Sequence, residues 1–451
     1  MRRLLPLLGL LALPFAFRPS TARAHGGLPI SETIIFQGDT LVVPTQFWGA
    51  FLGKDGGPWR WICEEAINKL QSRRWALGGD GTYHVTDYAG VTSSRDGGCT
   101  WVASTGEIAK RSTSAVLGDP ADPKRAWATT DAGSDAPWNA LFSTTDGGLT
   151  WTPVLMADEY LRGVAISPDG MRVYTTGSAR AQTMSSDGDG GAISDGGAPD
   201  AAVLLHVSPD GGKSWSALPI RYTLENFAPT RIVPIAVDPT DSNIVYLRVE
   251  TDPTSVLLRA TVGKGGVTVV ELLKKTGSTR SPGISGLGFN AAKNELFIAA
   301  ADGLYRSIAG APPERTSMLS QAQCAVPHDG KLYACAWNYT PDNAAIARSD
   351  DDGQSFTKVF QYADTAGPIA TCPASTPVAK ICPAVWEMYG ENLGIHVPSL
   401  DAGTGSTGGN GDTGKGSGGC EVGGARGGVG VLLGGTLFFA AVIFGRRRRK
   451  N

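Results

Sequence analysis

Acidic side chains are the residues of this sequence whose types could do chemistry without a cofactor. A glycoside hydrolase needs two carboxylates in one cleft, and the candidates are Asp131, Asp135, Glu159, Glu225 and Glu387. Nothing in their linear spacing pairs any two of them. No G-x-S-x-G nucleophile motif occurs and the chain has only 5 histidines, which gives nucleophilic hydrolysis little support. We therefore expect no catalytic residue and no cofactor-binding residue.

A metal site would depend on one acidic segment, residues 179–202. Its Asp187, Asp189, Asp195 and Asp200 could donate oxygen atoms to Ca²⁺. An EF-hand-type loop counted from Asp187 needs Glu at its twelfth position, where this chain has Ala198. The composition favours a disordered loop of Asp and Gly, and no closely spaced Cys and His residues indicate zinc. We expect no bound metal.

Cysteines offer disulfide chemistry, because six of the seven precede Cys420 and an even number is typical of disulfide-bonded extracellular proteins. The six candidates are Cys63, Cys99, Cys324, Cys335, Cys372 and Cys382. Fifteen pairings are possible, and the spacing favours three local ones. Cys324 and Cys335 flank one hairpin turn, Cys372 and Cys382 enclose a Pro-rich loop, and Cys63 would then join Cys99.

The elements that position these residues come from an internal repeat. Its clear copies are SRDGGCTW (94–101), TTDGGLTW (144–151), SPDGGKSW (208–215) and SDDDGQSF (349–356). The shared positions are Asp96, Gly98 and Trp101; Asp146, Gly148 and Trp151; Asp210, Gly212 and Trp215; and Asp351, Gly353 and Phe356. Asp can accept hydrogen bonds from its own turn, Gly allows a positive φ, and the aromatic residue begins a strand with a large area to bury. These segments are predicted to be structural hairpin turns rather than ligand sites.

Weaker copies at 53–59, 258–266 and 304–307 bring the number of repeats to seven. A polar turn followed by a β-rich run precedes each copy, from Asp39-Thr40 to Asp329-Gly330. The spacing of the copies is close to that of four-stranded propeller blades. The sequence thus predicts an all-β fold, a single seven-bladed β-propeller of four-stranded antiparallel blades over about residues 28–397. The insertion 179–202 is expected between strands two and three of the fourth blade, on the face opposite the Asp turns.

The pattern Ser/Thr-x-Asp-x-Gly-x-Ser/Thr-aromatic resembles the BNR or Asp-box repeat. The body resembles sialidase-superfamily and photosystem II assembly-factor-like propellers, and more distantly sortilin-type receptors. A sialidase would need three arginines, a Tyr nucleophile and an Arg-Ile-Pro element before the first Asp-box. The nearest match, Arg231-Ile232-Val233-Pro234, lies in mid-chain with an extra residue. The resemblance implies a non-catalytic module for a protein or glycan ligand, with a sialidase-like or xyloglucanase-like glycoside hydrolase as the alternative.

Both ends of the chain have the composition of sorting signals. Arg2 and Arg3, an apolar stretch and Ala22-Arg23-Ala24 predict a signal peptide cleaved after Ala24. At the other end, a Gly/Ser/Thr linker (401–419) precedes Cys420, an apolar helix (429–445) and five basic residues (446–450). This order predicts a membrane anchor with the body outside the cytoplasm. It also resembles the MYXO-CTERM tail of myxobacterial surface proteins, which implies a sorting protease acting near Cys420; removal and retention of the helix both remain open.

Charge separates the body from its ends. The 451 residues have a net charge of −2, but the two ends hold 11 of the 40 Lys and Arg residues and 3 of the 42 Asp and Glu residues. Residues 25–400 therefore carry about ten net negative charges, which gives no reason to expect nucleic-acid binding. The predicted organisation is a signal peptide (1–24), a propeller (25–400), a linker (401–419) and a sorting or transmembrane tail (420–451). We expect display at the cell surface.

Overall fold

A computed structural model describes residues 28–67, 74–130, 138–178, 203–224, 231–251, 253–277, 283–393 and 395 of the chain. The chain divides into two compact units, residues 1–399 and 400–451, and every described residue belongs to the first. Several predictions concern other residues: the signal peptide with Ala24, the acidic insertion 179–202, the linker, Cys420 and the apolar segment 429–445. These lie outside the described residues.

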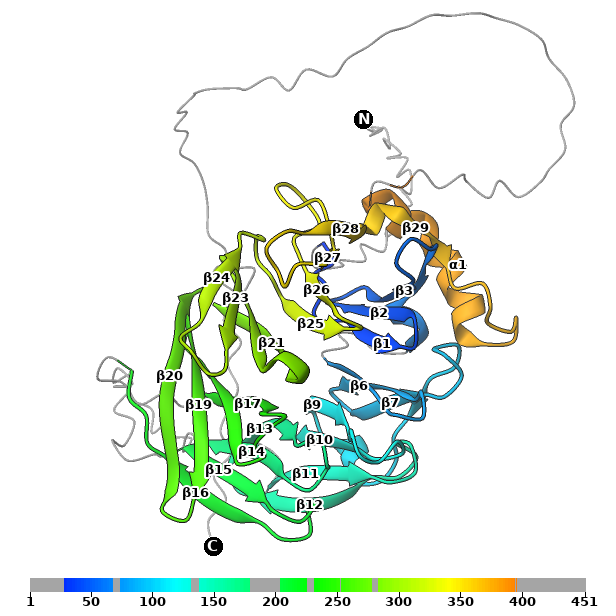
Figure 1. Ribbon diagram of the computed structural model, residues 1–451. Coiled ribbons are helices and arrows are strands. Elements are labelled where there is room, and N and C mark those ends of the chain that lie inside the picture. Colours follow the sequence, from blue (N-terminus) through cyan, green and yellow to red (C-terminus); the bar gives the residue numbers. More distant parts are fainter. Residues whose placement is uncertain are drawn as a thin grey trace, which may run out of the picture. The chain divides into compact units, whose positions relative to one another are not determined.

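The described residues form seven sheets arranged as blades around a central axis (Figure 1), which confirms the predicted seven-bladed propeller. Each blade contains four consecutive antiparallel strands. Blades 1 to 4 consist of β1 (Ile35–Gln37), β2 (Thr40–Thr45), β3 (Gly49–Gly53), β4 (Trp59–Ile62); β5 (Trp75–Leu77), β6 (Tyr83–Asp87), β7 (Gly90–Ser94), β8 (Val102–Ala103); β9 (Thr113–Gly118), β10 (Ala126–Thr130), β11 (Asn139–Thr144), β12 (Thr152–Ala157); and β13 (Tyr160–Ile166), β14 (Val173–Ser178), β15 (Val203–Ser208), β16 (Ser216–Ile220). Blades 5 to 7 consist of β17 (Ile232–Val237), β18 (Ile244–Glu250), β19 (Thr254–Gly263), β20 (Gly266–Thr276); β21 (Ile284–Asn290), β22 (Glu295–Ala300), β23 (Gly303–Ile308), β24 (Glu314–Ser317); and β25 (Cys324–His328), β26 (Lys331–Cys335), β27 (Ile346–Ser349), β28 (Thr357–Phe360).

Strand direction gives the disc two different faces. The hairpins between strands one and two and between strands three and four lie on one face, which we call the turn face. Connections between strands two and three, and from one blade to the next, lie on the opposite link face. Every predicted polar turn joins strands one and two, and the four clear Asp turns join strands three and four. β14 ends at Ser178 and β15 begins at Val203, so the insertion falls between strands two and three of blade 4, as predicted.

Blade 1 has a fifth strand that the sequence did not predict. β29 (Thr365–Pro368) pairs in parallel with β4, and the chain continues into α1 (Pro377–Asn392) outside this blade (Figure 1). Thr376 caps the helix by accepting a 3.5 Å hydrogen bond from the Ala379 backbone N–H, and Pro377 occupies the first turn, where a missing N–H is tolerated. The interpretation of residues 372–382 as a Pro-rich loop is therefore wrong from Pro377 onward.

The last part of the described chain, residues 361–393, crosses from blade 7 to blades 1 and 2, and we call it the C-terminal strap. It begins with η4 (Tyr362–Asp364) and contains β29 and α1; three other short 3-10 helices are η1 (Glu64–Ile67), η2 (Ile108–Lys110) and η3 (Ala291–Lys293). α1 packs on η1 and β29. The Tyr362 hydroxyl lies 2.7 Å from the Ser31 hydroxyl, and its ring centroid lies 5.0 Å from that of Phe51. The strap thus closes the seam between the first and last blades.

Disulfides hold the strap in place, and two of the predicted pairings are wrong. Cys324–Cys335 forms across the β25–β26 hairpin, as predicted. The expected Cys63–Cys99 and Cys372–Cys382 bonds exchange partners, and the observed bonds are Cys63–Cys382 and Cys99–Cys372, with sequence separations of 319 and 273. The reason is long-range, because the strap returns to blades 1 and 2 and brings both of its cysteines to partners near the start of the chain. All six cysteines are buried.

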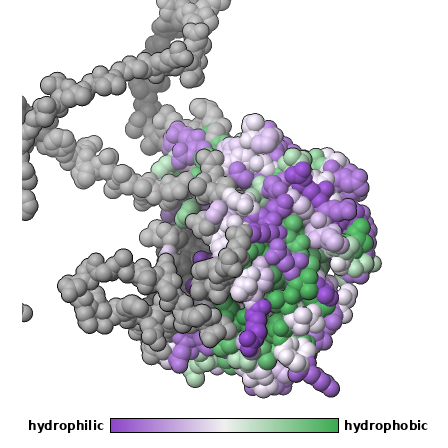
Figure 2. Space-filling model, turned by 90° about the vertical axis from the view of Figure 1, so that its left-hand side faces the viewer, coloured by the Kyte–Doolittle hydropathy of each residue, from purple (hydrophilic) through white to green (hydrophobic). Residues whose placement is uncertain are grey.

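The outer edge of the disc shows a band of hydrophobic residues. Figure 2 shows the side on which β20 and β24 lie in Figure 1, with hydrophobic residues gathered between hydrophilic ones. Val270 on β20, Ile308 at the end of β23 and Met318 just after β24 are exposed. Among the described residues nothing identifies a partner for this band.

Candidate functional site

The Asp turns use their polar groups internally. In blade 3, one carboxylate oxygen of Asp146 accepts hydrogen bonds from the backbone N–H groups of Leu149 (2.9 Å) and Thr150 (3.0 Å) and from the Thr144 hydroxyl (2.7 Å). The other oxygen accepts from the Thr150 hydroxyl at 2.6 Å. Burial alone would raise the pKa of Asp146, but these hydrogen bonds outweigh it and lower the pKa to about 2. Both oxygens of the carboxylate therefore stabilise the turn that contains it.

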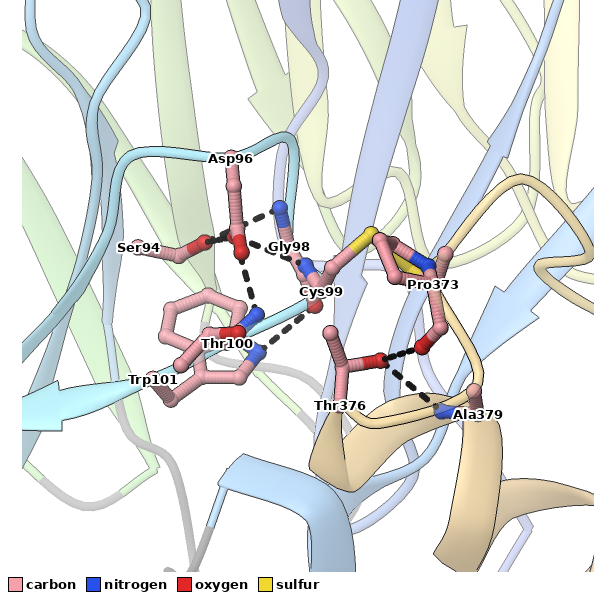
Figure 3. Close-up of a disulfide and its surroundings, with 10 residues drawn as sticks. Ser94, Asp96, Gly98, Cys99, Thr100, Trp101, Pro373, Thr376 and Ala379 are labelled. Atoms are coloured by element: carbon pink, nitrogen blue, oxygen red, sulfur yellow. Dashed lines mark hydrogen bonds between the residues drawn. A yellow bond between two sulfur atoms is a disulfide. The ribbon is translucent and has the colours of Figure 1, made fainter.

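The Asp turn of blade 2 is in addition linked covalently to the C-terminal strap. Figure 3 shows Asp96 accepting from Ser94 and from the backbone of Cys99 and Thr100, while Cys99 forms its disulfide with Cys372. The Trp101 indole N–H donates to the Gly98 carbonyl at 2.9 Å. This arrangement fixes the turn against the strap.

Basic side chains connect most successive blades on the turn face. Arg95 of blade 2 donates to the Gly147 carbonyl in the Asp turn of blade 3, and Arg125 of blade 3 donates to Gly211 in that of blade 4. Arg172 reaches Asn243 of blade 5 at 2.7 Å. The turn face is therefore a network of structural contacts, which single-repeat reasoning does not predict.

Only two of the five candidate hydrolytic carboxylates, Glu159 and Glu387, lie in the described part of the chain. Asp131, Asp135 and Glu225 lie outside the described residues. Glu159 precedes β13 in blade 4, 3.9 Å from the His206 imidazole, whereas Glu387 lies on α1, outside blade 1. The two described candidates therefore do not share a cleft.

The propeller axis instead holds a charged cavity of about 360 Å³, lined by the inner parts of all seven blades. Its charged residues are Glu32, Arg74, Arg162, Arg231, Arg248 and Glu250. Glu32, Arg74 and Arg231 lie just before the first strands of blades 1, 2 and 5, and Glu250 ends β18. These positions are on the link face, so we call this cluster the channel mouth. Four guanidinium groups face two carboxylates, which leaves an excess of two positive charges.

Glu250 binds two of the arginines in the cluster. The Arg248 guanidinium donates to it at 2.9 Å and also to the Ser285 carbonyl at 2.9 Å, and Arg231 forms an ion pair with its second oxygen. Burial would raise the pKa of Glu250, but the positive charges of Arg248, Arg231 and Arg74 lower it below its usual range. Glu250 is therefore ionised and held by two arginines.

Glu32 differs from Glu250 in its surroundings. Its side chain is 12% exposed, and the Arg74 guanidinium lies 3.7 Å from its carboxylate. Burial raises the pKa of Glu32, and the attraction of Arg74 offsets this only in part. The side chains of Arg74 and Arg231 remain 53% and 56% exposed. Two guanidinium groups therefore reach solvent at the channel mouth with donors to spare, a geometry suited to carboxylate or sulfate oxygens.

The channel mouth was not predicted from the sequence, although Arg231 belongs to the displaced sialidase-like element noted there. Its signal is a basic residue at or just before strand one in blades 2, 4 and 5, which aligning the repeats on strand one would have found. Three aromatic side chains near the loops, Trp138, Trp337 and Tyr339, have packing partners within the protein. The Arg111 guanidinium lies 3.5 Å from the Trp138 ring centroid, and Trp337 packs edge-on against Tyr339 at 5.4 Å.

The described part of the chain shows neither a metal-binding cluster nor a membrane-spanning helix. It contains no group of three or more His, Cys, Asp or Glu side chains that could hold a metal ion. None of its helices is long and apolar enough to cross a membrane. The Asp187–Asp200 segment proposed for Ca²⁺ and the apolar segment 429–445 lie outside this part.

Comparisons with known proteins add no family. No protein-family model and no curated protein matches the chain. Solved structures similar to it include the Dos1 propeller (TM-score 0.46, 11% identity, covering 71% of this chain and 76% of that one) and Sqt1 of Saccharomyces cerevisiae (TM-score 0.44, 9% identity, covering 73% and 84%). A nidogen/laminin complex is similar over 64% of this chain and 94% of that chain (TM-score 0.39, 14% identity). At these values the likeness carries no functional argument, and the fold rests on the strand order itself.

Proposed function

We propose that this chain is an exported, cell-surface-anchored β-propeller that acts as a non-catalytic binding module for a protein or glycan ligand. The channel mouth carries the proposal, because it offers two half-exposed guanidinium groups in a body with about ten net negative charges. Such a site favours a ligand with an anionic group. The turns are of the Asp-box type in this proposal, and they build the scaffold rather than the site.

Export and anchoring are supported by separate features. Three disulfides suggest an extracellular or secreted protein. The N-terminal 24 residues have the pattern of a signal peptide, and the order of linker, Cys420, apolar helix and basic end resembles a MYXO-CTERM tail. Mass spectrometry of the mature protein tests both ends. An N-terminus at His25 and an end near Cys420 are expected, whereas an uncleaved N-terminus would contradict export.

The binding proposal is tested by screening residues 25–400 against acidic and neutral glycans and acidic peptides, scored for binding and for cleavage. Arg74→Gln and Arg231→Gln, alone and together, should weaken binding of the acidic ligands and its dependence on salt. Arg315→Gln is the matched control, because Arg315 is 44% exposed in blade 6 and does not line the channel. Equal binding by the double variant and the wild type would refute the site.

A glycoside hydrolase remains the second candidate because of one observation. Glu32 and Glu250 line the same channel, and burial raises the pKa of one while three arginines lower the pKa of the other. Environments that move the pKa values of two carboxyl groups in opposite directions are typical of a general acid and its ionised partner. Against it, both oxygens of Glu250 are engaged by arginines. Cleavage in the same screen that is lost in both Glu32→Gln and Glu250→Gln would favour the hydrolase over the binding module.

A further inference from the structure

The seam between the first and last blades contains a second cavity, on the turn face. Its volume is about 510 Å³, within the range of about 300–1,000 Å³ typical of small-molecule sites. It lies between the β1–β2 and β3–β4 hairpins of blade 1 and the β25–β26 hairpin and β27 of blade 7. We call it the seam pocket; it shares no lining residue with the channel mouth.

One wall of the seam pocket is aromatic and apolar. The Phe36 ring stacks on the His328 imidazole with centroids 3.8 Å apart and planes at 11°, and Tyr333 meets Phe36 edge-on at 5.1 Å. Leu41, at only 2% exposure, lies beneath. Aromatic groups from two different blades thus pack into one wall, in which Phe36 and His328 are half-buried and Tyr333 is buried. Aromatic rings of this kind pack well against the C–H groups of a ligand.

The rim of the pocket is charged but electrically balanced. Asp39 faces Lys54 at 3.5 Å, Asp55 pairs with Arg348, and Asp329 lies 3.4 Å from His328. With Lys331, the rim carries three carboxylates and three permanent cations. The permanent charges of this rim therefore cancel, and the rim does not select for an anion or for a cation. The channel mouth differs, because it has an excess of two positive charges.

Balanced charges beside aromatic rings fit one class of ligand. A hydroxyl group donates to a carboxylate and accepts from an ammonium or guanidinium group, so a neutral polyhydroxylated ligand uses both halves of the rim. Asp39 and Asp329 have side chains 86% and 85% exposed, so their oxygens are accessible. We propose that the seam pocket binds a neutral sugar residue, which packs on the Phe36–His328–Tyr333 wall and hydrogen-bonds to the charged rim. This site is separate from the anion site and does not depend on it.

The test is saturation-transfer NMR and calorimetry on residues 25–400 with the methyl glycosides of glucose, mannose and galactose, and with glucuronic acid. At least one neutral glycoside should bind with a dissociation constant in the range of about 0.1–10 mM, as expected of a small ligand with few contacts. Phe36→Leu keeps the apolar volume but removes the ring, and should weaken binding about threefold to tenfold, the effect of one lost aromatic contact. Lys331→Met should weaken binding without touching the core.

Lys213→Met is the matched control, because Lys213 is exposed in the Asp turn of blade 4 on the same face and lies outside the pocket. It should bind like the wild type. Three results would overturn the proposal: no saturation transfer to any neutral glycoside, binding that is equal in wild type, Phe36→Leu and Lys331→Met, or glucuronic acid displacing the neutral glycosides with at least tenfold higher affinity. Because Lys331 lies on the rim, its variant remains informative even if Phe36→Leu does not fold.

Discussion

Removing the two strap disulfides should cost more together than the sum of their separate costs. The bonds are nested, because Cys63–Cys382 encloses Cys99–Cys372 in the sequence. Residues 63 and 99 are 36 apart and residues 372 and 382 are 10 apart, so with one bond intact the other closes an effective loop of about 46 residues. With neither bond present, the first to form closes a loop of 273 or 319 residues.

The magnitudes follow from the entropy of loop closure in the unfolded chain. A loop of about 46 residues corresponds to about 4 kcal/mol and one of about 300 residues to about 6 kcal/mol at 25 °C. Each single removal should therefore lower the free energy of unfolding by about 4 kcal/mol, and the double removal by about 10 kcal/mol. The double variant should lose about 2 kcal/mol more free energy of unfolding than the two single variants combined. Only in the double variant does no disulfide join the strap to blades 1 and 2 in the unfolded chain.

The assay is urea unfolding of residues 25–400 with paired Cys→Ala substitutions at each bond. The Cys324–Cys335 pair is the control, since it spans 11 residues within one hairpin; its removal should cost about 3 kcal/mol and add to that of either strap bond. A loss of about 10 kcal/mol approaches the whole stability of a typical domain, so the double variant should be largely unfolded at 37 °C. A double variant that loses no more than the sum of the single ones would refute the reasoning.

Three further predictions concern the turns and their neighbours. The pKa of Asp146 is about 2, against an ordinary value of 3.8. The ionised carboxylate therefore stabilises the folded protein fully above pH 4, and this contribution is lost as the pH falls toward 2. When the urea midpoint is measured against pH, Asp146→Asn should flatten the profile in this range. Burial lowers the pKa of His84 from 6.5 to about 4, so the free energy of unfolding should also fall as the pH decreases from 6.5 to 4. His84→Gln should remove that decline. An unchanged pH profile in this variant would contradict the attribution of the decline to His84. Gly98→Ala should destabilise the protein more than Gly97→Ala does. Both glycines have a positive φ, but only a Cβ atom at Gly98 would meet Ile62, at 2.4 Å. Equal urea midpoints for the two variants would show that backbone strain alone determines the loss of stability.

Features that depend on residues close together in the sequence could be predicted from the repeat. Each Asp turn carries its own acceptors, glycine and aromatic residue within eight residues, so both its conformation and its place between strands three and four could be predicted from the sequence. The number of blades followed from counting such turns. The acidic insertion was placed correctly between β14 and β15 for the same reason, because two turn types bracket every blade and their separation shows where extra residues lie.

Non-local features could not be predicted in this way. The strap returns over about 300 residues to blades 1 and 2, and no periodic signal marks that return, so Cys372 and Cys382 were assigned to each other. α1 contains Pro383 in its interior, and the Cys63–Cys382 bond and the packing on η1 hold the helix in place. The channel mouth is likewise non-local, since Arg74 and Arg231 are separated in sequence and come together only because each precedes an inner strand.

The distribution of charge narrows the kind of ligand that the channel mouth can accept. A body with about ten net negative charges repels polyanions, whereas the channel mouth holds an excess of two positive charges in a cavity of about 360 Å³ on the axis. A long polyanion would keep most of its charges outside this cavity and would be repelled by the net negative charge of the body, whereas a ligand with one anionic group and an otherwise neutral body would be repelled much less. Repulsion outside the site thus adds to the selectivity that the arginines supply within it. If the seam pocket also accepts neutral sugars, a largely neutral glycan or glycoprotein carrying isolated acidic groups satisfies both sites, and a uniformly sulfated or phosphorylated polymer satisfies neither.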